Sequence, residues 1–232
     1  MICHGMRCVF VHIPKVAGQS IEQFFMDRLG LDRDRDREAL HLHNNDDPGR
    51  GTQKLSHLSA AEYVDCGHMT AGDFAAYFKF AFVRNPWERI LSEYRYRNYF
   101  RHRSFRDFVL NKLPAPGWDD KYRHVMPQYD MLHDAQGRLL VDFVGRYENL
   151  QTDFDVVCAR LGIQESTLPH RNSSDKKSRD RKRRLRNFLF RNGENGHHRL
   201  GDFYDRETRD AVAELYRRDI ETFGYRFPYA LR

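Results

Sequence analysis

The sequence lacks any apolar run long enough to span a bilayer, and its first residues show no basic segment followed by a short apolar stretch. A membrane-spanning helix and a secretion signal are therefore not expected. Cysteine is scarce as well, and no two cysteines form a C-x-x-C pair. This spacing argues against a disulfide framework and a thiolate zinc site, and it favours a reducing compartment. The four cysteines are Cys3, Cys8, Cys66 and Cys158.

Two further kinds of pattern are missing. No segment has the spacing of a Walker A loop, and we find no carboxylate or histidine set with metal-ligand spacing. HLH at 41–43 and the pair His197 and His198 are too short to count as metal sites. There is no internal repeat, and 232 residues with 40% hydrophobic content can bury one sizeable core. We expect a single domain over 1–232.

Basic residues outnumber acidic ones. Lys and Arg total 39 against 33 Asp and Glu, which gives a net charge of +6 and favours an anionic partner. Many of these charges lie between Lys176 and Arg186, inside a segment, 171–200, that we predict to be an exposed basic loop. A solvated loop is the simplest interpretation. An anionic glycan, a lipid head group or a nucleic acid is the alternative partner for this run.

One segment combines a buried strand, a loop and a helix. The run Cys8–Ile13 is apolar and is followed by Pro14 and the loop KVAGQS. A helix with a regular apolar face should follow, with Ser20 near its N-cap. The unpaired amides of a helix start, with Lys15 beside them, make a cradle for phosphate. The alternative is a surface lysine and a turn glycine, Gly18.

A second segment repeats this order. A strand is predicted at Phe78–Val83, followed by Arg84, Asn85 as N-cap and Pro86 at the first helical position. Ser92 lies eight positions after the arginine, about two helical turns along. Parallel α/β sheets bind ligands at this edge of their strands, and arginine suits a phosphate. The alternative is that Arg84 is paired with a carboxylate such as Glu88.

The remaining chain continues the alternation of strands and helices. We predict a third strand at 139–144 and a helix at 154–161 that ends before Gly162. A final continuous helix should run from a cap at Asp205 to Gly224, whereas 32–54 is expected to be an exposed connection. The fold class is therefore α/β, with a central parallel sheet flanked by helices.

Both phosphate segments resemble motifs of one family. FVHIPKVAGQSI at 10–21 resembles the 5′-phosphosulfate-binding loop of the bacterial and membrane-type carbohydrate sulfotransferases, the group that includes heparan sulfate 2-O-sulfotransferase. FVRNPWERILSEY at 82–94 resembles the 3′-phosphate-binding segment of the same family. GHM at 67–69, VDFVGRYENLQTDF at 141–154, LPHRNSS at 168–174 and the terminal ETFGYRF extend the likeness in the same order.

The resemblance implies a fold, a donor and residue roles. The fold would be a P-loop-like nucleotide-binding sulfotransferase fold, and the donor 3′-phosphoadenosine 5′-phosphosulfate, with no metal required. His68 matches the segment that supplies a histidine base in related enzymes, His124 is the other candidate base, and His12 is interpreted as structural. The implied donor contacts are Lys15 on the transferring group; Gly18, Gln19 and Ser20 around the 5′-phosphate; Arg84 and Ser92 on the 3′-phosphate; and Ser173 on the 3′-phosphate or adenine side.

The acceptor expected from the resemblance is a hydroxyl of a carbohydrate or glycolipid. A small-molecule kinase is one rival, although it would need a magnesium site and a Walker loop. A basic nucleic-acid-binding protein is the other, but no recognisable binding module is present and no nucleic-acid partner is expected. We expect a bacterial cytoplasmic enzyme; a trimmed Golgi enzyme would look similar.

Overall fold

A four-stranded sheet forms the centre of the protein. In the computed structural model, which describes residues 1–169 and 200–228, the strand order is β1-β2-β3-β4. β2, β3 and β4 are parallel, with Cys8 opposite Phe78 and Phe80 opposite Phe143, whereas β1 pairs antiparallel with β2. The strands are β1 (Ile2–Cys3), β2 (Cys8–Val11), β3 (Phe78–Val83) and β4 (Phe143–Arg146).

The strand predictions were most accurate where polar residues and a proline directly follow the apolar run. β3 has the predicted bounds, and β2 stops at Val11, two residues short of the prediction. The third predicted strand, 139–144, was misplaced by a few residues, because β4 begins at Phe143 while Leu139 makes an isolated bridge to His133. The run 139–144 lacks a regular alternation of apolar and polar residues, so the pattern could not set the register. The edge strand β1 was missed.

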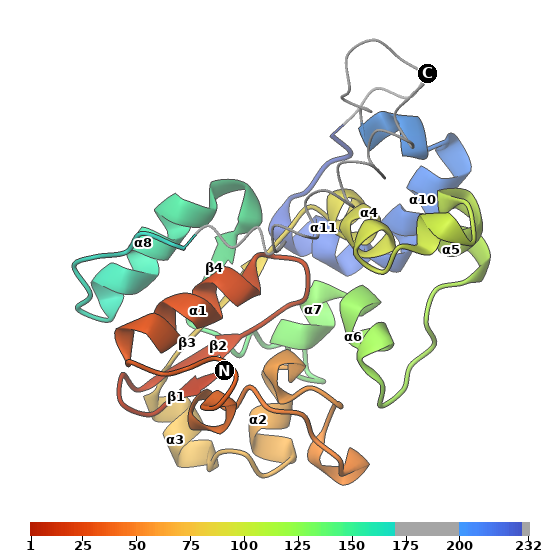
Figure 1. Ribbon diagram of the computed structural model, residues 1–232. Helices are drawn as coiled ribbons and strands as arrows, with labels where there is room; N and C mark the ends of the chain where they lie inside the picture. Colours follow the sequence, from red (N-terminus) through yellow and green to blue (C-terminus); the bar gives the residue numbers. More distant parts are fainter. Residues whose placement is uncertain (170–199, 229–232) are drawn as a thin grey trace.

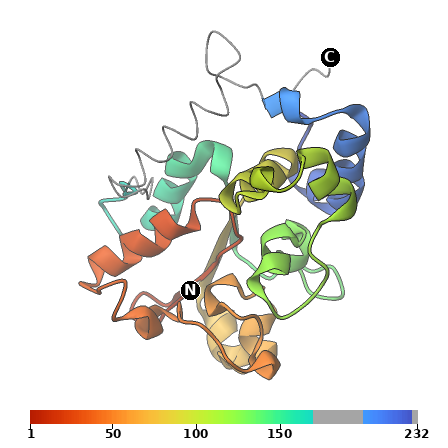
Figure 2. The same ribbon diagram turned by 45° about the vertical axis from the view of Figure 1, so that its right-hand side comes forward.

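Helices cover both faces of the sheet (Figures 1 and 2). α1 (Gly18–Arg28) and α8 (Leu150–Arg160) lie side by side on one face, where the rings of Phe24 and Phe154 meet edge to face at 4.9 Å. α2 (Glu62–Asp65) and α3 (Ala71–Ala76) lie on the other face. The helix at 154–161 was thus predicted correctly, although it begins four residues earlier.

A layer of helices lies beyond the carboxyl ends of β2 and β3, at the right of Figure 1. Asp205 caps its last part with a reciprocal bond to Thr208, as expected. The predicted continuous final helix is instead broken at Tyr216, whose φ of −108° and ψ of 28° are not helical. The layer contains α4 (Pro86–Tyr96), α5 (Phe105–Asn111), α6 (Asp120–Val125), α7 (Gln128–Leu132), α10 (Arg206–Leu215) and α11 (Arg217–Phe223).

The segment 32–54 is more ordered than predicted. It contains the 3₁₀ turns Arg37–Leu40 and Pro48–Arg50, and an antiparallel bridge joins Asn44 to Lys54. Leu40 and Asn45 are buried, so this segment is part of the packed structure rather than an exposed connection. Because charged residues are frequent in this segment, its few buried side chains could not be recognised from the sequence.

Two further predictions concern the basic loop and the absence of a membrane-spanning helix. The predicted basic loop lies almost wholly outside the described residues. Among the described helices, none has the length and apolar character needed to cross a bilayer.

Candidate functional site

The loop between β2 and α1 holds two non-glycine residues in the left-handed region. Lys15 has a φ of 75° and Ala17 a φ of 66°, a conformation that costs free energy for side chains of this kind. The N-cap of α1 is Ala17, not Ser20, and no side chain caps the helix. The N–H of Ser20 donates to the Ala17 carbonyl at 2.9 Å, whereas those of Gly18 and Gln19 have no partner among the described residues. These two amides are left for a ligand, and the helix dipole favours an anion there.

Gly18 is required because a histidine ring packs against it. A Cβ at this position would lie 2.0 Å from His12 Nε2. The ring is held by Glu22, whose carboxylate lies 2.6 Å from His12 Nδ1 and also accepts a hydrogen bond from Arg33 at 2.8 Å. Although burial acts to raise it, the pKa of Glu22 is lowered to about 2 by these two partners. His12 thus supports the loop, as predicted.

β3 ends beside the same loop and places Arg84 against it. The guanidinium donates to the carbonyl of Lys15 at 3.2 Å, so the two predicted phosphate segments are in direct contact. Gln128 fixes the arginine backbone by accepting from its N–H and donating to its C=O. Arg89 of α4 is buried and donates to the carbonyl of Pro14, which ties α4 to the loop.

The guanidinium of Arg84 has unused hydrogen-bonding capacity. Glu88 lies 3.4 Å from Nη2, so the ion pair considered from the sequence does form. The group also stacks on the Tyr147 ring at 4.1 Å, and Nε is buried without a hydrogen-bond partner among the described residues. A buried N–H without a partner is costly, and an anion would satisfy it.

These groups border a single cleft of about 760 Å³. Its wall includes every predicted donor contact that the structure describes: Lys15, Gly18, Gln19, Ser20, Arg84 and Ser92. Arg33, Arg37 and Lys54 also line it, against one carboxylate, Glu22. The cleft is therefore suited to a ligand with several negative charges. Ser173 lies outside the described residues.

The ammonium group of Lys15 lies over an aromatic ring. Its Nζ lies 3.8 Å from the centroid of Tyr96, which also lines the cleft. Burial lowers the pKa of Lys15 to about 8, with the nearby charges of Arg84 and Arg97 acting in the same direction and Glu93 opposing them. The ammonium group of Lys15 therefore loses its proton at a pH only slightly above neutral.

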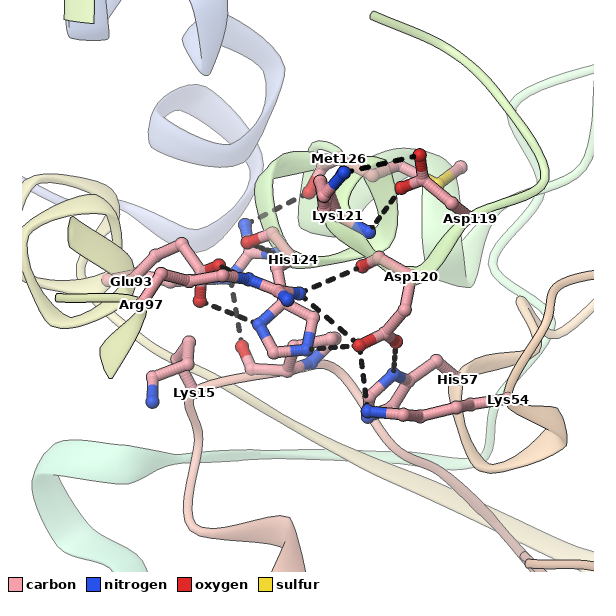
Figure 3. A network of polar contacts seen from close by, with 12 residues as sticks. Lys15, Lys54, His57, Glu93, Arg97, Asp119, Asp120, Lys121, His124 and Met126 are labelled. Carbon is pink, nitrogen blue, oxygen red and sulfur yellow. Dashed lines mark hydrogen bonds and ion pairs between the residues drawn. The ribbon is translucent and has the colours of Figure 1, made fainter. Parts of the chain in front are cut away.

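Beside Lys15 lies a buried polar network (Figure 3). Asp120 accepts from His57 Nδ1 at 2.6 Å and from Lys54 at 2.8 Å. His124 Nδ1 lies 2.6 Å from Glu93, which also accepts from Arg97 at 2.7 Å. Both histidines line the cleft, so this network borders it, and the His57 ring lies 4.9 Å from that of His12 beside the start of α1.

His57 is held in a defined protonation state. Burial lowers its pKa to about 3, although Asp120 acts to raise it. The pKa of Asp120 is well below its usual range, because its hydrogen bonds to His124 and His57 outweigh the effect of burial. We therefore assign a neutral imidazole that donates Nδ1–H to an ionised carboxylate. Nε2 has no hydrogen-bond partner among the described residues and is the free acceptor.

His68, the residue expected to act as base, is not among the residues that line this cleft. It follows Gly67, which has a positive φ, and its Nε2 pairs with the carbonyl of Arg50 at 2.9 Å. His57 was missed because a histidine in KLSHLSAAEY carries no signal by itself. Only the approach of Asp120, 63 positions away, distinguishes it.

A relative from Archaeoglobus fulgidus, described as an uncharacterized protein, is 35% identical over 96 residues, which cover 40% of this chain and 73% of the relative. No solved structure matches. Residues 1–226 match the sulfotransferase family, and the chain therefore belongs to that family.

Proposed function

We propose that this protein transfers a sulfuryl group from 3′-phosphoadenosine 5′-phosphosulfate to a hydroxyl of a carbohydrate or glycolipid. One observation carries the proposal: the Lys15 loop and the Arg84 segment, from separate strands, border the same cleft and touch through the Lys15 carbonyl. The strand, loop and helix that bind the phosphosulfate would make this a P-loop-like fold. Family membership supports sulfuryl transfer.

The two ends of the donor are assigned to different groups. The uncapped start of α1, with Gly18, Gln19 and Ser20, would receive the 5′-phosphosulfate. Arg84 and Ser92 would receive the 3′-phosphate, with the unpartnered Nε of Arg84 as one donor. Ser173 stays a prediction for the 3′-phosphate or adenine side.

Lys15 would act on the leaving group. Negative charge grows on the bridging oxygen as the sulfur–oxygen bond breaks, and a cation held there stabilises the transition state. The lysine, the helix start and Arg84 together supply a positive field along the donor. Transfer would be direct and in line, with the acceptor oxygen attacking sulfur as the bisphosphate departs.

His57 is the base that the geometry favours. Asp120 holds the Nδ1–H, so Nε2 is left to take the proton of the acceptor hydroxyl. Its low pKa makes it a weak base in the empty cleft, but the negative charge of a bound donor would raise that pKa. His124 lines the same cleft, yet both of its nitrogens already face carboxylates, at 2.6 Å and 3.3 Å.

Titration calorimetry with four ligands tests the proposal. Adenosine 3′,5′-bisphosphate should bind far more tightly than AMP, because AMP has no 3′-phosphate to accept from Arg84 and a hydrogen bond to a charged group contributes about 1.5–3 kcal/mol. ATP and an oligonucleotide should bind weakly. Equal affinity for the bisphosphate and AMP would contradict the 3′-phosphate site, while preference for ATP would favour a kinase.

A further inference from the structure

Three histidines gather outside the cleft, on the other side of the segment that forms one of its walls. The ring of His41 lies 5.3 Å from that of His43 and 4.5 Å from that of His68. His41 and His43 come from the 41–47 segment, whereas His68 follows α2. We call these three side chains the imidazole cluster. The sequence separates them by up to 27 positions, so only the fold brings them together.

Each ring of the imidazole cluster has a buried nitrogen without a partner among the described residues. These atoms are Nε2 of His41, Nδ1 of His43 and Nδ1 of His68. His68 is oriented by its other nitrogen, since Nε2 lies 2.9 Å from the Arg50 carbonyl. That contact makes Nε2–H the donor and leaves a lone pair on Nδ1. Histidines that bind metals are oriented in this way.

The cluster is held at some cost in free energy. His41 has a φ of 59°, in the left-handed region, which costs free energy for a residue other than glycine. Three rings with buried, unpartnered nitrogens are costly by themselves, and such a nitrogen is the atom through which imidazole binds a transition metal.

We propose that the imidazole cluster binds a divalent transition metal ion, with Zn²⁺ as the natural occupant. Three imidazoles suit Zn²⁺, Co²⁺ or Ni²⁺, whereas Mg²⁺ and Ca²⁺ prefer oxygen ligands. The carboxylates of Asp46 and Asp47 line a neighbouring hollow of about 450 Å³ together with His41, His43 and Arg50. They add negative charge beside the rings, which favours a cation.

A second set of ligand atoms provides a contrast. His57, Asp120 and His124 have ligand atoms within 4.8 Å of one another. However, Lys54 and Arg97 already bind the Asp120 carboxylate, and these cations would repel a metal. The imidazole cluster is less convergent than this set, so His41 and His43 must turn about the broad χ2 torsion to bring their free nitrogens to one ion beside Nδ1 of His68. His68 stays in place through its bond to the Arg50 carbonyl, and among the described residues the nearby Arg50 makes no hydrogen bond to the three free nitrogens.

The position of the site couples it to the donor cleft. Side chains alternate along 41–44: His41 and His43 line the hollow, whereas Leu42 lines the donor cleft and Asn44 lines both. Asn44 pairs with Lys54, and the N–H of Leu55 donates to the His43 carbonyl at 3.3 Å. A metal held by His41 and His43 would therefore fix one wall of the cleft from behind.

The test uses the full chain stripped with EDTA and titrated with Co²⁺ or Zn²⁺ alone. One equivalent of Co²⁺ should give the visible absorption of a four-coordinate site, and Zn²⁺ should displace it. His43→Ala and His68→Ala should each weaken Zn²⁺ binding by more than about 100-fold, because losing even an outer partner of a ligand costs about 10- to 100-fold. His43→Gln and His68→Gln keep the side-chain volume and should behave likewise.

Three controls separate this site from other histidines. His102→Ala removes an exposed histidine, His57→Ala removes the cleft set, and His197→Ala with His198→Ala removes the adjacent pair outside the described residues. All three should retain wild-type Zn²⁺ affinity. Circular dichroism and bisphosphate binding check that each variant is folded. Wild-type protein that binds no Co²⁺ in the micromolar range, or loss only in His57→Ala or the His197/His198 variant, would overturn the proposal.

Discussion

Arg84 is the residue on which the donor assignment depends most directly. Gln128 fixes its backbone, its guanidinium stacks on Tyr147, and the buried Nε has no hydrogen-bond partner among the described residues. Arg84→Ala should weaken bisphosphate binding about 10- to 100-fold, since a hydrogen bond to a charged group contributes about 1.5–3 kcal/mol. AMP affinity should change little. Arg101→Ala, an exposed arginine, is the matched control, and calorimetry measures all four affinities.

Lys15 gives the site a pH dependence whose sign can be worked out. Its pKa of about 8 lies below the ordinary 10.5 because burial disfavours the charged form. The charged lysine needed for transfer is therefore present below pH 8 and lost above it. We expect kcat/KM, which reports the free enzyme, to be level below that value and to fall as pH rises through about 8.

The same shift predicts an opposite effect on stability. Between about pH 8 and 10.5 the unfolded chain holds this proton and the folded protein does not, so this group's contribution to the free energy of unfolding rises with pH.

Lys15→Arg tests the assignment of the pH dependence of kcat/KM to Lys15. Arginine stays charged, so the pH at which kcat/KM falls should be higher in this variant. If that pH is unchanged in the variant, another group titrates.

His57 and His68 can be distinguished by comparing turnover with binding. His57→Ala should lower kcat by about two to four powers of ten, the usual contribution of a positioned base, and leave bisphosphate affinity intact. His68→Ala should keep near-normal turnover at saturating donor, because His68 is not among the residues lining the cleft. The reverse result would restore His68 as the base, as the sequence suggested. If neither variant loses turnover, His124 is the residue to test next.

At the scale of elements, the sequence predicted best the boundaries that helix-capping residues and prolines specify. β3 and α4 were accurate because Asn85 and Pro86 mark a helix start, and Asn85 does accept from the Trp87 N–H. β4 was misplaced and β1 missed, because strand register depends on partners far along the chain. The strand and helix that flank Arg84 could therefore be predicted, while the segment 32–54 could not.

The same distinction between local signals and distant contacts applies to the residues of the site. The proximity of Lys15 and Arg84 was predictable, because Lys15 lies in the loop after β2 and Arg84 directly follows β3, and the carboxyl ends of parallel strands meet at one edge of the sheet. His57, Tyr96 and Asp120 were not, because their roles arise from contacts between a 3₁₀ turn, α4 and α6. No residue pattern in a single sequence reports such contacts.

The packing at the start of α1 can be tested by comparing alanine substitutions at two glycines, Gly18 in α1 and Gly72 in α3. Gly18→Ala places a methyl group 2.0 Å from the His12 ring, so the ring or the loop must move. We expect a loss of about 1–3 kcal/mol in stability, as for overpacked cores, and weaker bisphosphate binding. Gly72→Ala in α3 meets only Thr70 Oγ1, at 3.9 Å, and should be neutral or slightly stabilising. Equal melting temperatures for both variants would show that the His12 contact is unimportant.

At the scale of the whole molecule, charge is unevenly placed. The net charge is +6, and the run from Lys176 to Arg186 alone holds eight basic residues. Neutralising that run would make the net charge negative, whereas the cations that line the donor cleft would be unaffected. Local contacts and long-range attraction can therefore be separated experimentally, because added salt screens the second far more than the first.

Replacing the eight basic residues of this run by glutamine should leave bisphosphate affinity nearly unchanged, because Lys15, Arg84 and Ser92 remain in the cleft. If the run guides an anionic acceptor, the acceptor's KM should rise and its dependence on salt should weaken; if the run is only solvated, neither should change. Steady-state kinetics at two ionic strengths, with calorimetry for the bisphosphate, measure these quantities. A large loss of bisphosphate binding at both ionic strengths would contradict both versions, because it would place the run in the donor site itself.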